Sequence, residues 1–229
     1  MFESLGNDLK ESSDFVSHLL NTKFKRHAMD NYITVVSGLP RSGTSMMMRM
    51  LELGGIEVVT DQIREADTDN PLGYYEFEQV KKISENTEWL RGTEGKVFKM
   101  ISMLLQHLPS DYRYKIVFMR RDIREILASQ AKMMRRMQTK GTDLGDEEMA
   151  RLYERHLAAT EKWLGCQPNI QVHYASYNDI LHDAQETISR LVQFLGRPLR
   201  MADMLSAIDS SLYRNRAMTQ NDAISPNHR

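Results

Sequence analysis

A glycine-rich stretch near the start of the chain has the residue types of a phosphate-binding loop. Residues 35–45 read VVSGLPRSGTS, in which Gly38 and Gly43 have the spacing of the pattern G-x-x-x-x-G-K-[ST]. Thr44 stands where nucleotide-hydrolysing proteins have a lysine, and Arg41 supplies a cation three residues earlier. Between a strand and a helix, such a loop turns backbone N–H groups and the positive end of a helix dipole toward an anion. The stretch therefore predicts phosphate binding, and the alternative is an ordinary tight turn.

A second cationic segment follows a later apolar run. Residues 114–119 (YKIVFM) lead into Arg120, Arg121 and Asp122. Metal-dependent phosphoryl-transfer enzymes often hold Mg²⁺ with a carboxylate at a strand end, whereas this strand leads into two cations, which favours a second bound anion. Ser129 follows Arg121 by eight residues, about two helical turns, so both side chains can reach one phosphate group at the strand ends. The alternative interpretation of the Arg-Arg-Asp run, considered by itself, is a solvent-exposed turn.

Strands and helices alternate along the chain in our prediction. Apolar, β-branched runs predict strands at 32–37, 96–99, 114–119 and 169–174. Apolar residues at helical spacing predict helices at 44–53, 75–91, about 123–137, 147–164 and 183–195. Alternation of this kind predicts an α/β fold of three layers, α/β/α, around a central parallel sheet. The glycine-rich loop then joins the first strand to the helix that follows it.

The length of the chain suits a single domain over residues 1–229. Residues 1–30 contain a predicted amphipathic helix that packs on the domain or mediates a subunit contact, which leaves a homodimer open. A polar loop is predicted at 60–73, and residues 215–229 form a polar tail without periodicity.

Composition and charge limit the classes of function. The 30 Lys and Arg residues nearly balance 31 Asp and Glu residues, so no overall charge favours nucleic acid. The single cysteine, Cys166, favours a reducing compartment, and we expect a cytoplasmic location. No apolar run approaches the roughly 20 residues of a membrane-spanning helix. The seven histidines are scattered without ligand spacing, and we expect no metal site.

The two phosphate motifs resemble those of sulfotransferases that use 3′-phosphoadenosine 5′-phosphosulfate. The similar stretches are GLPRSGTS and the later Arg-Asp-x-Arg-x-x-x-x-Ser, and the resemblance extends over about 33–199. It implies a P-loop NTPase-like sulfotransferase fold, with this nucleotide as donor cosubstrate and no metal. It also implies that the first loop binds the 5′-phosphosulfate through Arg41, and that Arg121 and Ser129 bind the 3′-phosphate. The other loop residues implied in binding are Pro40, Ser42, Gly43, Thr44 and Ser45.

Two later segments add to the resemblance. Residues 177–180 (YNDI) are similar to a Tyr-Glu-Asp-hydrophobic segment of the family, which implies that Tyr177 lies near the adenine. Arg214 and Arg216 stand where family members often close a basic loop over the nucleotide. A solvated tail is the alternative for this arginine pair.

The acceptor side departs from one branch of the family. That branch has Lys-x-His after a strand, where the lysine steadies the leaving group and the histidine is the base. Here the segment reads Lys99-Met100-Ile101, so the lysine matches and the histidine is absent. Residues 70–76 (NPLGYYE) resemble an N-P-x-G-[YF]-x-E stretch of bacterial sulfotransferase-like proteins, which makes Glu76 the first candidate for the base. Asp61 or another nearby carboxylate is the alternative base, and a helix-terminus role is the alternative for Glu76.

We therefore expect transfer of a sulfuryl group to a hydroxyl or amine. The acceptor is open among small molecules, carbohydrates and lipids, and Lys99 and Arg41 are expected to assist Glu76 in catalysis. Two other hypotheses remain at this stage. One is a nucleotide kinase or hydrolase with an altered loop, and the other is a nucleotide-binding protein without catalysis that acts as a sensor or scaffold.

Overall fold

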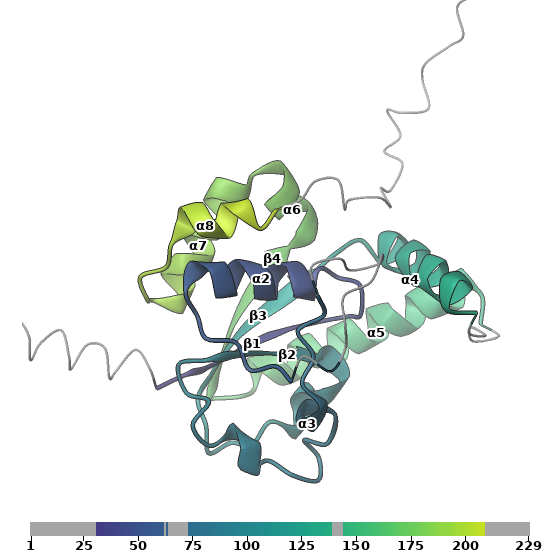
Figure 1. Ribbon diagram of the computed structural model, residues 1–229. Helices are drawn as coiled ribbons and strands as arrows, with labels where there is room; N and C mark the ends of the chain where they lie inside the picture. Colours follow the sequence, from purple (N-terminus) through teal and green to yellow (C-terminus); the bar gives the residue numbers. More distant parts are fainter. Residues whose placement is uncertain (1–30, 62, 64–72, 139–143, 209–229) are drawn as a thin grey trace, which may run out of the picture.

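A sheet of four parallel strands forms the centre of the fold (Figure 1). The strand order is β2-β1-β3-β4, with β1 at Ile33–Gly38, β2 at Val97–Ile101, β3 at Tyr114–Arg120 and β4 at Ile170–Ser176. The computed structural model describes residues 31–61, 63, 73–138 and 144–208. The four predicted strands are therefore confirmed at the expected places.

Burial explains why these segments form strands. Every residue of β1 is buried, and β2 and β3 are buried over most of their length. A parallel sheet is covered on both faces, so neighbouring apolar side chains find partners on opposite sides. Val35 packs in the core on one face and Val36 in the core on the other. Full burial of one such side chain stabilises the fold by about 1.5–3 kcal/mol.

Helices cover both faces of the sheet, which confirms the three-layer α/β/α prediction (Figure 1). On one face lie α2 (Thr44–Gly54), α6 (Tyr177–His182), α7 (Ala184–Leu195) and α8 (Met201–Ser206). On the other face lie α3 (Glu78–Lys81), the 3-10 helices η1 (Glu88–Leu90) and η2 (Ser102–His107), and α5 (Asp146–Gly165). Helix α4 (Ile123–Met137) follows β3 and packs against α5.

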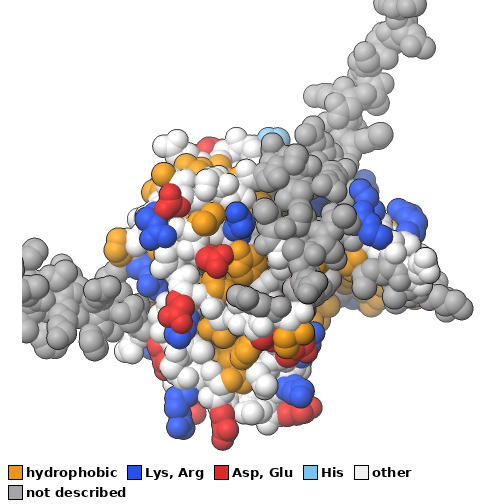
Figure 2. All heavy atoms as spheres, in the orientation of Figure 1, with side chains coloured by type: hydrophobic (Ala, Val, Ile, Leu, Met, Phe, Trp, Pro, Cys, Tyr) orange, Lys and Arg blue, Asp and Glu red, His pale blue; other side chains and the backbone are white. Residues whose placement is uncertain are grey.

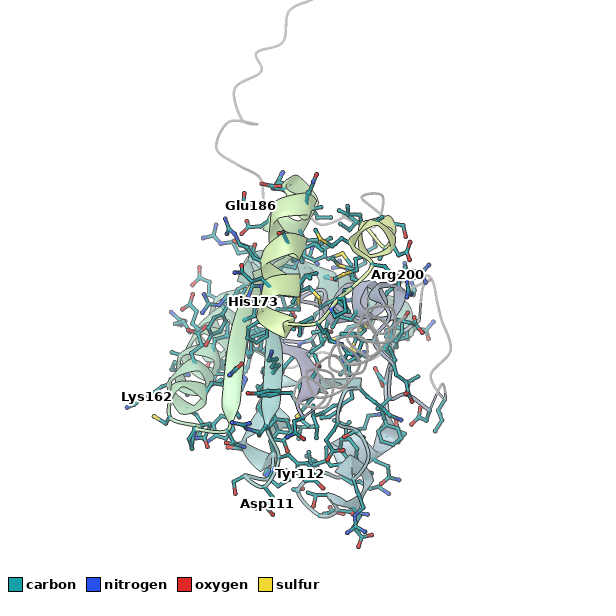
Figure 3. All side chains as sticks on the ribbon, turned by 90° about the vertical axis from the view of Figure 1, so that its left-hand side faces the viewer. Asp111, Tyr112, Lys162, His173, Glu186 and Arg200 are labelled. Carbon is teal, nitrogen blue, oxygen red and sulfur yellow. The ribbon has the colours of Figure 1, made fainter. Side chains whose placement is uncertain are left out.

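The edge strand β4 is only partly buried and is covered on one side by α7. His173 of β4 stacks on Phe194 of α7, with ring centroids 5.2 Å apart. Figure 3 shows His173 on this strand, next to the helix. Burial, together with the charge of Arg190, lowers the pKa of His173. The ring is therefore neutral near pH 7, as its place between strand and helix favours.

The helix predicted at 75–91 is wrong, because the structure has only the short α3 and η1 there. Asn86 lies between them, and its side-chain oxygen accepts a hydrogen bond from the backbone N–H of Glu88 at 2.9 Å. The carbonyl of Asn86 also accepts from the indole N–H of Trp89 at 3.1 Å. Local bonds of this kind compete with helical bonds and break the segment. The prediction also missed α6.

The chain as a whole is nearly neutral, but its charged side chains gather at particular places on the surface. Figure 2 shows Lys and Arg side chains gathered where α4 lies, and the last turn of that helix carries Arg135 and Arg136. Within the described part of the chain, no helix has both the length and the apolar character needed to cross a membrane. The amphipathic helix predicted at 1–30 and the tail at 215–229 lie outside the described residues.

Candidate functional site

The predicted phosphate motifs meet at one edge of the sheet, where β1 and β3 end side by side. Gly38 is in register with Met119 of β3, and on its other side with Ile101 of β2. The chain runs from β1 to β2 on one side and later enters β3 on the other. Open α/β sheets bind ligands beyond the carboxyl ends of the strands at such a reversal of strand order. The loop after β1 and the Arg121 segment after β3 both begin at this point.

The backbone of the glycine loop is fixed by three residues with positive φ. These are Gly38 (149°), Arg41 (73°) and Gly43 (97°). Gly43 is the N-cap of α2, and a Cβ atom there would lie 2.4 Å from Cδ2 of Tyr177, so only glycine fits. Because the N-cap is a glycine, it has no side chain to bond the first N–H groups of α2, and the first turn of this helix has no acidic residue. The N-terminus of this helix is therefore suited to an anion.

Ser42 places a buried hydroxyl at the base of the loop. The residue is 1% exposed, and its Oγ has no hydrogen-bond partner among the described residues. It lines a pocket of about 270 Å³ with residues from the loop, the end of β3, and helices α4 and α5. The other lining residues are Leu39, Met119, Arg120, Arg121, Asp122, Ile123, Ile126 and Leu157. A buried orphan hydroxyl is a group that a bound polar ligand can satisfy.

A set of bonded side chains, which we call the Arg121 cluster, connects the loop with α4 and α6. Its members are Arg41, Arg121, Glu125, Ser129, Tyr177 and Asn178. The Nε of Arg41 donates to Oγ of Ser129 at 3.0 Å, and Nη1 of Arg121 donates to the carbonyl of Arg41 at 3.2 Å. Two motifs separated by about eighty residues are thus in direct contact through Arg41, while the binding of a phosphate by Arg121 and Ser129 stays a prediction.

Buried contacts hold Arg121 in place. Its Nε donates to Oε2 of Glu125 at 2.9 Å, and the two side chains are 7% and 2% exposed. Nδ2 of Asn178 donates to the other oxygen of Glu125 at 3.4 Å. The guanidinium of Arg121 also lies 4.3 Å from the ring centre of Tyr177. Cation–π and charge-assisted contacts in such a dry setting fix the orientation of the arginine.

Local capping explains why Ser129 faces the loop. Asp122 is the N-cap of α4, and its Oδ1 accepts from the backbone N–H groups of Arg124 and Glu125 at 2.8 and 3.2 Å. This cap fixes where α4 begins, and therefore which helical face carries Ser129. Nε2 of Gln130, on the same helix, reaches the carbonyl of Pro40 at 3.5 Å.

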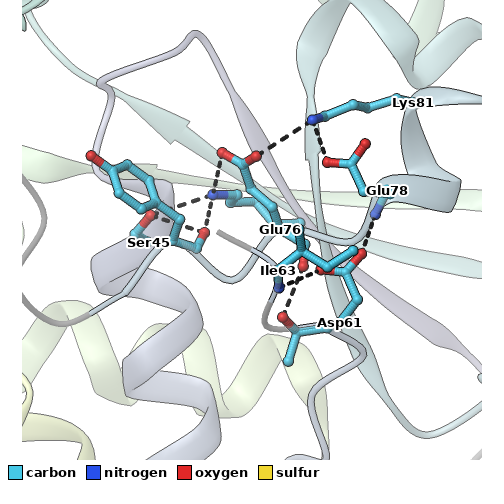
Figure 4. A network of polar contacts seen from close by, with 9 residues as sticks. Ser45, Asp61, Ile63, Glu76, Glu78 and Lys81 are labelled. Atoms are coloured by element: carbon cyan, nitrogen blue, oxygen red, sulfur yellow. Dashed lines mark hydrogen bonds and ion pairs between the residues drawn. The ribbon is translucent and has the colours of Figure 1, made fainter. Parts of the chain in front are cut away.

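A second set of side chains, the Lys99 cluster, lies at the start of α2 (Figure 4). Its members are Ser45, Tyr74, Glu76, Lys81 and Lys99. The Nζ of Lys99 donates to the carbonyl of Tyr74 and to Oγ of Ser45, the latter at 3.4 Å. Glu76 lies between two lysines, with its carboxylate oxygens 4.0 Å from Nζ of Lys99 and 3.7 Å from Nζ of Lys81. The two predicted catalytic residues of the acceptor side are therefore neighbours.

Asp61, the alternative base, is engaged in local hydrogen bonds. Its Oδ2 accepts from the backbone N–H of Glu78 at 2.6 Å, and its Oδ1 accepts from that of Ile63 at 3.1 Å. Desolvation raises the pKa of Asp61, but these backbone hydrogen bonds outweigh it, and the pKa is lowered from its ordinary value. The carboxylate of Asp61 thus anchors the start of α3, whereas that of Glu76 faces two lysines.

Each predicted site residue has a definite position where the structure describes it. Thr44 begins α2, and Ser45 contacts Lys99. Tyr177 is 6% exposed and packs on the loop, while its contact with adenine stays a prediction. Arg214 and Arg216 lie outside the described residues.

The prediction missed the role of Glu125, although an acid four residues after Arg121 on a helix is a usual partner. No group of three or more His, Cys, Asp or Glu residues in the described ranges could hold a metal ion.

Comparisons with known proteins agree on one description. A family model described as "Sulfotransferase domain" matches residues 8–226. The sulfotransferase domain from the curacin biosynthetic pathway shares 15% identity and a TM-score of 0.47, with 79% of each chain covered. Mouse sulfotransferase SULT7A1 complexed with PAP shares 16% identity and a TM-score of 0.49, covering 84% of this chain and 69% of that one. The sulfotransferase domain of the Synechococcus PCC 7002 olefin synthase shares 15% identity and a TM-score of 0.45, with coverages of 85% and 83%. The search of curated proteins finds no significant match.

Proposed function

The chain belongs to the sulfotransferase family and is an enzyme of sulfuryl transfer, and we propose that its donor is 3′-phosphoadenosine 5′-phosphosulfate. The observation that carries the proposal is the contact of Arg41, in the glycine loop, with Arg121 and Ser129. This donor has two separate phosphate groups, one at each end of the ribose. Two adjoining anion sites at the carboxyl edge of the sheet fit a ligand of that kind.

The residues divide between the two ends of the nucleotide. Loop N–H groups, the N-terminus of α2, Thr44 and Ser45 bind the 5′-phosphosulfate. Arg121 and Ser129 bind the 3′-phosphate. Arg41 belongs to the loop by its backbone and contacts Ser129 by its side chain. Tyr177 completes the wall beside Arg121.

The Lys99 cluster carries the chemistry of transfer. The donor supplies an activated sulfuryl group when it is bound. The acceptor oxygen or nitrogen forms a bond to sulfur as the bond from sulfur to the bridging oxygen breaks, and that electron pair leaves with adenosine 3′,5′-bisphosphate. Glu76 accepts the acceptor proton, and Lys99 stabilises the negative charge that grows on the leaving oxygen. The acceptor is a small molecule, a carbohydrate or a lipid that bears a hydroxyl or an amine.

Binding of the nucleotide product tests the donor assignment. Calorimetry should detect 1:1 binding of adenosine 3′,5′-bisphosphate without magnesium, and Arg121→Ala should weaken it at least about tenfold through loss of charge-assisted bonds. If the parent protein does not bind this nucleotide but turns over ATP in the presence of magnesium, the kinase or hydrolase hypothesis would be supported instead.

Turnover tests the assignment of the base. With a panel of hydroxyl and amine acceptors, release of adenosine 3′,5′-bisphosphate by Glu76→Gln should fall about 10²- to 10⁴-fold in kcat, since a general base contributes that much. Glu78→Gln is the matched control, because Glu78 is a neighbouring, more exposed carboxylate paired with Lys81. Equal rates for Glu76→Gln and the parent would remove Glu76 from the mechanism, and no turnover with any acceptor would favour the scaffold hypothesis.

Two further expectations concern the setting of the enzyme. The single cysteine, Cys166, is exposed, and we propose a cytoplasmic location because reducing compartments preserve a free thiol. A homodimer, formed with the segment at 1–30, also stays a proposal, and light scattering of the full chain and of a chain lacking that segment checks it.

A further inference from the structure

We propose that Tyr75 positions Glu76 for proton transfer, because a hydrogen bond from its hydroxyl to Glu52 ties the segment before α3 to helix α2. The proposal rests on the proposed function, since Glu76 is a base only if the chain transfers a sulfuryl group to an acceptor. Tyr75 is a positioning residue in this proposal, because it acts through Glu76 and not by contact with the substrate.

The contact between Tyr75 and α2 is short. Oη of Tyr75 donates to Oε2 of Glu52 at 2.6 Å, a length typical of a bond from a hydroxyl to a carboxylate. The ring of Tyr75 packs against the core on the face of the sheet that α2 covers. Burial, together with the bond to Glu52, raises the pKa of Tyr75 to about 12, although the charge of Arg49 acts against them. The hydroxyl therefore keeps its proton near pH 7 and can donate it.

One side of α2 holds two successive residues of the segment. Oγ of Ser45, in the first turn of α2, donates to the carbonyl of Tyr74 at 3.4 Å, and Glu52 accepts from Tyr75. Ser45 and Glu52 are separated by about two helical turns, so they lie on nearly the same side of the helix. The N-terminus of α2 is also expected to hold the 5′-phosphosulfate. The bond from Tyr75 thus fixes the segment of the base relative to the helix of the donor.

The backbone at Tyr75 needs such contacts. Its φ of 53° is in the left-handed region, which residues other than glycine adopt only at a cost. Conformations of this kind persist where the surrounding structure holds them. Before the bend, the carbonyl of Tyr74 accepts from Nζ of Lys99. After it, the carbonyl of Glu76 accepts from Oγ1 of Thr60 at 2.8 Å. The strained residue therefore lies between two anchored carbonyls.

The residues on either side of Glu76 are held in different cores. Tyr75 packs on the face of the sheet that carries α2, whereas Phe77 packs on the other face. The ring of Phe77 lies 5.3 Å from that of Trp89, measured between centroids. Between them, the carboxylate of Glu76 lies 4.0 Å from Nζ of Lys99 (Figure 4). Loss of the Tyr75 anchor releases one of the two sides, and a displacement of about 1 Å can lower a rate about 100-fold.

Tyr75→Phe tests the role of the hydroxyl, because it removes only that group and keeps the ring. Release of adenosine 3′,5′-bisphosphate from the donor is measured with 2-naphthol, 1-octanol or glucosamine as the acceptor. The kcat of Tyr75→Phe should fall about 10- to 100-fold, while its affinity for adenosine 3′,5′-bisphosphate should stay within about twofold. Glu52→Ala should reproduce this loss. Glu52→Gln, whose amide oxygen still accepts a hydrogen bond, should keep most of the parent's rate.

A double-mutant cycle separates positioning from a general structural role. In the Glu76→Gln background, Tyr75→Phe should change kcat by less than about twofold, because the group that the hydroxyl positions is already absent. A loss of the same size in both backgrounds, or a kcat of Tyr75→Phe equal to that of the parent, would overturn the proposal. Tyr112→Phe is the matched control, since it removes a hydroxyl near the amino end of β3, and it should behave as the parent. If Glu76→Gln itself keeps the parent's rate, the assignment of the base is refuted instead.

Carbodiimide labelling of carboxylates gives a measurement that needs no acceptor. Mass spectrometry compares the labelling rate of Glu76 with that of Glu78, a neighbouring and more exposed carboxylate. In Tyr75→Phe this ratio should rise at least about threefold, because the side chain of Glu76 is freer to move away from the lysines. An unchanged ratio would overturn the proposal even in the absence of turnover. Melting temperatures of the variants close to that of the parent ensure that folded proteins are compared.

Discussion

The Arg121 cluster and the Lys99 cluster contact the same loop and helix, yet the ion pair of the first is shorter and more deeply buried than that of the second. In the Arg121 cluster, the ion pair between Arg121 and Glu125 is 2.9 Å long, and its side chains are 7% and 2% exposed. In the Lys99 cluster, Nζ of Lys99 and Oε1 of Glu76 are 4.0 Å apart, and their side chains are 13% and 21% exposed. The side chains of the Arg121 pair are held in a short, buried contact, whereas those of the Lys99 pair are farther apart and more exposed to solvent.

Under the proposed function, the difference follows from what each cluster has to do. A site that always binds the same nucleotide gains affinity when its side chains are already oriented before the ligand arrives. A general base has to exchange a proton during each turnover, and a carboxylate sealed in a short buried ion pair would resist protonation. The looser contact of Glu76 with two lysines is therefore suited to catalysis, and the locked pair is suited to recognition.

The largest expected effect comes from breaking the buried pair. Glu125→Ala removes the carboxylate that pairs with the buried Arg121, and the free energy of unfolding should fall by about 3–5 kcal/mol. Glu76→Ala removes the corresponding acid of the other cluster, and the loss should be under about 1 kcal/mol because that pair is longer and more exposed. Urea unfolding at pH 7 measures both. Equal losses in the two variants would contradict the contrast between the clusters.

A medium effect is expected where the loop packs on the Arg121 cluster. Gly43→Ala combines a positive φ with a close approach to Tyr177, so unfolding should become easier by about 2–4 kcal/mol. Gly92 also has a positive φ, 81°, and a Cβ atom there would meet nothing within 4 Å. Gly92→Ala should therefore cost only about 1–2 kcal/mol, the backbone strain alone. Thermal unfolding of the two variants isolates the contribution of the contact, and a result in which Gly92→Ala costs as much would show that the contact with Tyr177 adds nothing.

The smallest effect is expected from Asp61, beside the Lys99 cluster. Because its folded pKa lies below the ordinary value of 3.8, the charged form stabilises the fold above about pH 4, and this contribution is lost as the pH falls through the folded pKa. Asp61→Asn should therefore be less stable than the parent by under about 1 kcal/mol at pH 7, since the residue is only partly buried and solvent weakens its contacts. The difference should vanish near pH 2. Chemical unfolding at both pH values makes the comparison, and a difference that grows in acid would have the wrong sign.

The sequence correctly predicted the elements whose structure is determined by the pattern of residues within the element itself. The strand at 32–37 and the helix at 44–53 were found because burial leaves β-branched runs and helical spacing as a signature. The helix at 75–91 was wrong because the hydrogen bonds of Asn86 outweighed the apolar spacing. The motifs also identified Arg121, Ser129 and Lys99, which the structure brings into contact with loop or helix residues.

Other features of the site depend on contacts between distant segments, which a single sequence does not display. Glu125 has the appearance of a solvated helical acid, and only the packing of α4 under the loop makes it a buried partner of Arg121. The direction of Arg41 depends on a positive φ that few non-glycine residues adopt. The engagement of Asp61 depends on a backbone N–H in α3, which was predicted as part of a longer helix.

The contacts of Arg121 with Tyr177 and of Asn178 with Glu125 also bear on how the protein folds. They join the end of β3 to the segment that follows β4, across more than fifty residues of chain. The proposed nucleotide site thus depends on long-range pairing, which forms slowly in parallel sheets. A nascent chain that stops before β4 lacks this wall, so nucleotide affinity reports that folding is complete. Once folded, a chain with ligand at 100 times its Kd gains about 2.7 kcal/mol of stability, and the supply of donor then influences how long the enzyme persists.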